Sequence, residues 1–203
     1  MLRLARIVTS NSHVDYVGRV IDALDAPSAP SADEYGFAQF VSIPLDRSDI
    51  IGIIYNSLLV NPDYGNYGPR LSPLSDLSVL SPDYLNEQGL LIGILLLGWR
   101  EHAQDEQQQR INHHTVPRRI IPVNQDIYRM TDEDVQSFHR DAGGGVALHY
   151  YSQIITHAGP FSVPLIEAII EQLEASCTPE ERQRLCVLKQ TLVWQRTVGG
   201  MRL

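Results

Sequence analysis

Lysine is almost absent from this sequence, which contains Lys189 and no other lysine. A Walker-type phosphate-binding loop needs glycines for close backbone approach, followed by Lys and Ser or Thr. No glycine loop precedes Lys189, so nucleotide hydrolysis at such a site is excluded. The net charge of −8 opposes sequence-independent binding to a long polyanion, because that binding depends on clustered Lys and Arg.

Cysteine and long apolar runs are also scarce. Cys177 and Cys186 do not form a CxxC pair, and no second pair completes a zinc site, so we expect two reduced thiols and no metal or other cofactor. The longest apolar run, residues 89–99, is too short for a transmembrane helix, which needs about 20 residues. The N-terminal apolar run is too short for a signal peptide, and we expect a cytoplasmic protein without membrane contact.

No complete catalytic motif is present. The sequence contains no G-x-S-x-G nucleophile elbow, and its histidines lack the i, i+4 spacing of a helical metal site. A small hydrolase using acids and histidines around Asp83, His139 and Asp141 is one alternative, with His149 as a further member. The glycine run 143–145 is either an anion cradle or a flexible turn, and turn chemistry favours the second.

The hydrophobic pattern predicts an α+β fold with a small N-terminal β-barrel of five to seven strands, a mixed segment and a C-terminal α-helical hairpin. We expect a β domain over residues 1–100, a polar loop and connecting segment over 101–160, and the hairpin over 161–203. The expected strands are residues 16–24, 35–43, 50–59 (bent at Gly52), 89–98 and 146–155. The expected helices are 131–139, 164–176 and 179–196, and capping signals support Thr131 and Thr178 as N-caps.

A loop over residues 61–70 is rich in Tyr, Asn, Pro and Gly. Long structured loops in compact domains are often functional, and Tyr and Arg are enriched at interface hot spots. We therefore predict a partner-binding surface, and the competing interpretation is that the tyrosines plug the barrel. The predicted contact residues are Asn61, Tyr64, Tyr67 and Arg70.

Several glycine-containing strand motifs resemble those of the HAS-barrel. They are Val17-Gly18-Arg19-Val20, the Phe-x-x-Phe-Val pattern within residues 35–41, Ile51-Gly52-Ile53-Ile54, and the apolar strand that ends at Leu97-Gly98. The HAS-barrel is the N-terminal barrel of HerA-type DNA translocases. The resemblance covers roughly residues 14 to 157. The family's ATPase core does not follow the barrel here, so none of its catalytic residues is carried over.

The resemblance implies a non-catalytic binding or assembly module. It implies ring-assembly contacts as a homo-oligomer, or docking of a protein partner such as a HerA-type ATPase or a NurA-type nuclease, in a bacterial DNA-processing system. A nucleic-acid-binding barrel is another alternative, although the net charge makes direct contact with nucleic acid unfavourable. Its contacts would come from Arg110, Arg118 and Arg119, together with Arg70.

Overall fold

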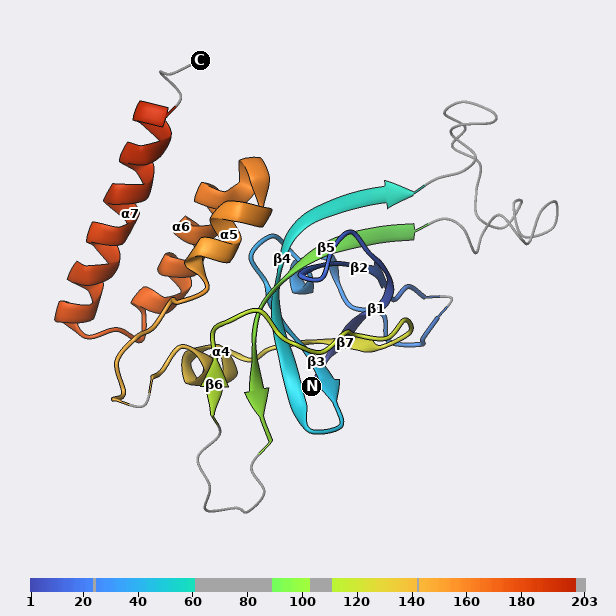
Figure 1. Cartoon of the computed structure of the whole chain (residues 1–203). Helices are drawn as coiled ribbons and strands as arrows, with labels where there is room; N and C mark the ends of the chain where they lie inside the picture. Colours follow the sequence, from blue (N-terminus) through green and yellow to red (C-terminus); the bar gives the residue numbers. More distant parts are fainter. Residues whose placement is uncertain (24, 61–88, 103–110, 142, 200–203) are drawn as a thin grey trace, which may run out of the picture.

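The computed structural model describes residues 1–23, 25–60, 89–102, 111–141 and 143–199, and for residues 192–199 it describes the backbone alone. Within these residues, a β-barrel is followed by a group of helices that packs against one side of it (Figure 1). The α+β class with an N-terminal barrel, predicted from the sequence, is confirmed.

Six antiparallel strands of the described chain close the barrel. Around it they run β1, β2, β5, β4, β3 and β7, and the pairing of β7 with β1 completes the circle. Their bounds are β1 Arg3–Ser10, β2 Asp15–Val20, β3 Phe40–Leu45, β4 Ser48–Val60, β5 Gly89–Glu101 and β7 Asp126–Arg129. A short strand, β6 (Asn112–His113), pairs with the end of β5.

In the barrel, the long apolar strands are hydrogen-bonded to a neighbouring strand along both edges. β5 lies between β2 and β4, and its residues Ile92 and Ile94–Leu97 are buried. The register between β4 and β5 shifts at Ile51/Gly52, which is the bend predicted at Gly52. A Cβ atom on Gly52 would lie 2.7 Å from Ile94 Cγ2, so the glycine permits this close approach.

Two strands have no strong signal in the sequence. β1 is interrupted by charged residues, and β7 has four residues and comes from the segment after residue 101. β7 closes the barrel because β1 and β3 both need a partner there. Asp126, at its start, accepts hydrogen bonds from Arg6 and, more distantly, Arg3 of β1. The predicted strand 35–43 begins later than expected, at Phe40, after a turn in which Gln39 N donates to Gly36 O.

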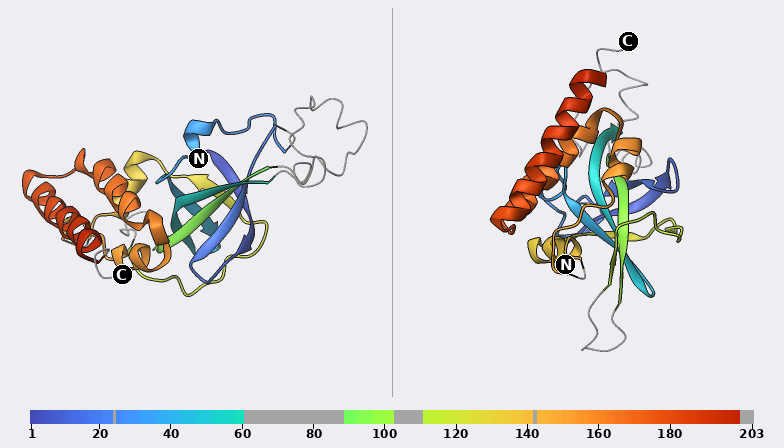
Figure 2. Two further views of the ribbon diagram at one scale, coloured as in Figure 1. Left: turned by 90° about the horizontal axis from the view of Figure 1, so that it is seen from above. Right: turned by 60° about the vertical axis from the view of Figure 1, so that its left-hand side comes forward.

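The helices form a layered group beside the barrel. Their bounds are η1 Ala32–Glu34, α4 Asp132–Phe138, α5 Tyr151–His157, η2 Gly159–Phe161, α6 Ser162–Glu174 and α7 Pro179–Gly199. α5 contacts β5, α6 packs between α5 and α7, and α7 is outermost, as both views of Figure 2 show. Among the described residues, no helix has the length and apolar character needed to cross a bilayer.

The strand predicted over residues 146–155 is wrong. Val146 pairs only with Arg140, as an isolated bridge, and the chain then enters α5. Tyr150 and Ile154 are both fully buried. Their i, i+4 spacing places them on one helical face. In the sequence, the neighbouring apolar residues make this helical spacing hard to distinguish from the pattern of a strand.

The N-cap of α7 also holds the helices together. Glu181 N donates to Thr178 Oγ1, and Thr178 N donates to Glu181 Oε2, which is the predicted capping box. Glu181 Oε1 accepts hydrogen bonds from Arg140 Nη1 and Val146 N. These hydrogen bonds and the Arg140 guanidinium lower the pKa of the Glu181 carboxyl, the bond from Thr178 N having the largest effect.

We expect Glu181→Ala to lower the melting temperature by several degrees, because it removes the acceptor for three donors from separate segments. Glu180→Ala is the matched control, since Glu180 is the exposed neighbour in the same helical turn. Thermal unfolding followed by circular dichroism compares the two variants. Equal melting temperatures would show that the Glu181 contacts contribute nothing to stability.

Candidate functional site

His139 and Asp141, the described members of the predicted hydrolase site, each have hydrogen-bond partners of their own within the protein. His139 is the C-cap of α4 and is 1% exposed. Its Nδ1 lies 2.7 Å from Val135 O, so Nδ1 carries the proton and donates, and Nε2 is left to accept from the Tyr150 hydroxyl. Both ring nitrogens are therefore engaged inside the protein.

Burial is the main reason that the pKa of His139 falls to about 3, and the nearby His114 and Arg100 lower it further. The imidazole is neutral at physiological pH. His139 lies at the end of the predicted helix 131–139, but a neutral ring there has no charge interaction with the helix dipole. Its neighbour His114 donates from Nε2 to Phe138 O, and burial lowers its pKa as well.

The Asp141 carboxylate accepts hydrogen bonds from the backbone of its own loop. Its Oδ1 accepts hydrogen bonds from Gly143 N at 2.8 Å and Gly145 N at 2.9 Å. The amides that might have cradled an external anion are thus occupied by this carboxylate, which supports the turn interpretation of the glycine run. Asp83, the third predicted member of the hydrolase site, lies outside the described residues. Among the described residues, no group of three or more His, Cys, Asp or Glu side chains is placed to hold a metal ion.

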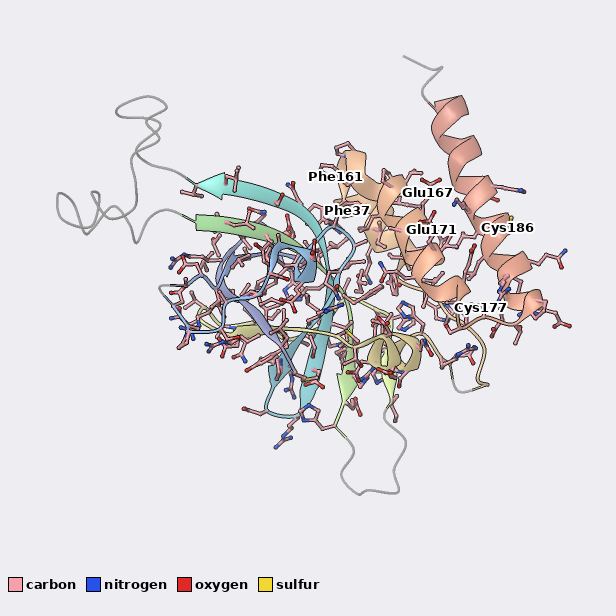
Figure 3. All side chains as sticks on the ribbon, turned by 180° about the vertical axis from the view of Figure 1, so that it is seen from behind. Phe37, Phe161, Glu167, Glu171, Cys177 and Cys186 are labelled. Atoms are coloured by element: carbon pink, nitrogen blue, oxygen red, sulfur yellow. The ribbon has the colours of Figure 1, made fainter. Side chains whose placement is uncertain are left out.

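The two cysteines differ in their exposure to solvent. Cys177, between α6 and α7, is buried, and Cys186, on α7, is exposed (Figure 3). Both are free thiols. Burial is the main cause that raises the pKa of the Cys177 thiol, which disfavours the reactive thiolate.

Arg118 and Arg119 line an open pocket of about 750 Å³ at one end of the barrel. We call it the basic pocket. Arg47 also lines it, from the two-residue turn between β3 and β4, which is seen at the lower end of the barrel in Figure 1. Trp99 and Glu101 of β5 also line it. Within the described part of the chain, none of these three arginine side chains has an ion pair or a hydrogen bond.

The backbone around Arg118 and Arg119 is fastened on both sides. His13 Nε2 donates to Pro117 O at 2.6 Å, and Ile121 N donates to the Tyr16 hydroxyl at 3.3 Å. Pro117 and Ile121 are buried, whereas residues 118–120 between them are exposed. These two hydrogen bonds therefore hold the backbone segment that carries the two exposed arginines. This reduces the conformational entropy that is lost when a ligand binds.

Arg47 and Trp99 are also held in place. The carbonyl oxygen of Arg47 accepts from His102 N at 3.2 Å, which ties the β3–β4 turn to the end of β5. The ring of Trp99 stacks on that of His113, with centroids 4.5 Å apart and an angle of 17° between the planes. These contacts give the basic pocket rigid walls on two sides.

A second pocket, of about 670 Å³, adjoins the first. We call it the side pocket. The two pockets share Asp46 and Arg119 as lining residues, and we call the two neighbouring pockets together the groove. The side pocket adds Ile120, which is 75% exposed, and Pro122. Gln125 and Pro44 also line the side pocket, and Gln125 Nε2 donates to Pro44 O at 2.7 Å.

A third, smaller pocket of about 290 Å³ lies where η2 meets the barrel. Phe37 and Phe161 flank it, and their rings are 6.0 Å apart at an angle of 57° (Figure 3). None of the described residues that line it is charged. This third pocket therefore offers contact area but no charged side chain that could pair with a charged ligand. The basic pocket is the stronger candidate for specific binding.

Comparison with known protein families gives a match that covers nearly the whole chain. The family described as "Domain of unknown function (DUF8166)" matches residues 1–202. The chain belongs to the DUF8166 family. No curated protein matches the sequence. The match extends over the barrel and the helices together, so the DUF8166 domain comprises both.

Of the residues predicted to contact a partner or a nucleic acid, the structure describes only Arg118 and Arg119, which were predicted as nucleic-acid contacts. Arg118 and Arg119 lie in the groove, whereas Asn61, Tyr64, Tyr67, Arg70 and Arg110 lie outside the described residues. Sequence reasoning missed Arg47 and Trp99. The available signal for Arg47 was its place in the short link, residues 44–49, between two predicted strands, but only the closed barrel shows that this turn lines a pocket with residues 118–119.

Proposed function

We propose that this DUF8166 protein is a non-catalytic binding module that docks a partner at the groove. The observation that carries the proposal is a set of three arginines around one open pocket, whose side chains have no ion pair or hydrogen bond among the described residues. The groups of the hydrolase alternative are engaged elsewhere: His139 by Val135 and Tyr150, and Asp141 by its own glycine loop. Charged side chains left free beside a groove are suited to recognition.

The class of partner to test first follows from the resemblance to the HAS-barrel. A closed six-stranded barrel followed by helices is compatible with an accessory of a HerA- or NurA-type system in the cytoplasm. In this proposal the barrel docks a HerA-type ATPase or a NurA-type nuclease. The protein itself performs no chemistry.

Direct binding to the purified ATPase and nuclease from the same genome tests the proposal. We expect one of them to bind in biolayer interferometry, and Arg118→Gln/Arg119→Gln to weaken that binding by about tenfold or more. The control is Arg184→Gln, which removes an exposed arginine on α7, away from the groove. Equal binding by the two variants would show that the partner docks elsewhere.

We also expect no ATP hydrolysis by the purified chain, because the only lysine lies on α7 without a glycine loop. A coupled phosphate-release assay measures it. If a turnover were found for ATP or any ester substrate, and if Asp141→Asn or His139→Gln abolished it, the hydrolase alternative would replace the binding module.

A further inference from the structure

The groove has two halves, the basic pocket and the side pocket, which differ in the number of arginines that line them, and this difference in charge restricts what can bind. Arg47 and Arg118 line the basic pocket alone, Arg119 lines both pockets, and Ile120 and Pro122 line the side pocket. A ligand that occupies both pockets therefore meets all three arginines at the basic pocket and the exposed Ile120 and Pro122 at the side pocket. Small anions would fill only the first half.

We infer that the occupant of the groove is an extended segment of a partner protein that carries acidic side chains next to apolar ones. This inference rests on the proposed function and names the chemistry of its ligand. The acidic side chains pair with Arg47, Arg118 and Arg119, and the apolar side chains cover Ile120 and Pro122. An extended peptide can reach both sets of residues because the two pockets share Asp46 and Arg119 as lining residues.

The charges in and around the groove favour such a peptide over a nucleic acid. Asp46 and Glu101 line the basic pocket beside the arginines, so a continuous row of phosphates would meet two carboxylates. The whole chain carries a net charge of −8, which repels a long polyanion. A peptide with spaced acidic residues can place each one opposite an arginine and avoid both carboxylates.

Aromatic stacking also argues against single-stranded nucleic acid. Binding of unpaired bases relies on open aromatic faces. Trp99 is the only Trp, Tyr or Phe among the described residues that line the two pockets, and His113 stacks against it. The side pocket offers proline, leucine and isoleucine instead, which suit aliphatic side chains.

The exposed Ile120 gives the apolar half a specific test. Ile120 is 75% exposed and lines the side pocket, whereas Val123 is 61% exposed, lies on the same segment and does not line it. Burial of apolar surface contributes to binding only where the ligand covers it. Ile120→Ser should therefore weaken binding, and Val123→Ser should not.

The experiment uses the full chain and fluorescence anisotropy with labelled probes. The principal probe is a peptide of repeated Glu-Leu-Pro units, in which proline favours an extended conformation. The comparison probes, of equal length, are Lys-Leu-Pro and Glu-Ser-Pro repeats and oligo-dT. We expect saturable binding of the Glu-Leu-Pro peptide, weaker binding of the Glu-Ser-Pro peptide, and none of the other two.

Variants assign the binding to the groove. Arg118→Gln/Arg119→Gln should weaken binding of the Glu-Leu-Pro peptide by about tenfold or more, and Arg184→Gln should leave it unchanged. If oligo-dT binds instead and depends on the same arginines, the groove is still the binding site and the peptide inference is wrong. Failure of the wild-type protein to bind the Glu-Leu-Pro peptide also overturns the inference, while the partner experiment judges the proposed function separately.

Discussion

Acidification from about pH 7 to about pH 4 should lower the free energy of unfolding by roughly 3 kcal/mol through His139 alone. The folded-state pKa of His139 is about 3, below the ordinary value of 6.5. Between these two values the unfolded chain binds a proton and the folded chain does not. The stability is therefore complete above the ordinary pKa and is lost progressively as the pH falls, at about 1.4 kcal/mol per pH unit.

Denaturant unfolding over this pH range, on the wild type and on His139→Gln, measures the effect. The variant lacks the titrating imidazole, so its stability should fall less steeply with acid, whatever its absolute stability. His157→Gln is the control, because it removes an exposed histidine of α5 and leaves the His139 imidazole in place. If His139→Gln is too unstable to fold, an NMR titration of the wild-type imidazoles decides: a His139 ring protonated at pH 6 would contradict the account.

Gly98→Ala should destabilise the protein by about 1–3 kcal/mol or more, as overpacking does in a rigid site. A Cβ atom at Gly98 would lie 1.9 Å from His113 O, 3.0 Å from His113 C and 3.3 Å from His114 Cα. All three atoms belong to the backbone, so no side-chain rotation relieves the clash. Strand β6 or the end of β5 must move.

Gly36→Ala is the matched control, because no atom lies within 4 Å of the added Cβ and the backbone there is not left-handed. It should change the stability by no more than about 1 kcal/mol, and it can stabilise by restricting the unfolded chain. Urea denaturation compares the two variants. Similar midpoints for Gly98→Ala and Gly36→Ala would show that β6 does not pack against β5 as described.

The parts of the fold with strong local signals were predictable from the sequence. β5 has an uninterrupted apolar run, Gly52 marks the bend of β4, and the capping residues Thr131 and Thr178 begin α4 and α7. In each case the signal lies within a few neighbouring residues. The barrel class followed from the strand spacing, and the structure confirms it.

The parts without local signals were not predictable. β7 has four residues, and it becomes a strand because β1 and β3 leave a gap that it fills. The basic pocket joins Arg47 to Arg118 and Arg119, about seventy residues later in the chain. Neither the turn at Arg47 nor the pair at 118–119 indicates the other, because only barrel closure brings them to one pocket.

The most direct test of the central claim is the melting temperature of the triple variant Arg47→Gln/Arg118→Gln/Arg119→Gln, measured together with its binding. The account predicts a melting temperature within about a degree of wild type, because unpaired, exposed charges contribute little to stability. It also predicts loss of binding to the partner and to the Glu-Leu-Pro peptide. A variant that melts several degrees lower and still binds would show that the arginines support the fold and that the groove is not the docking site.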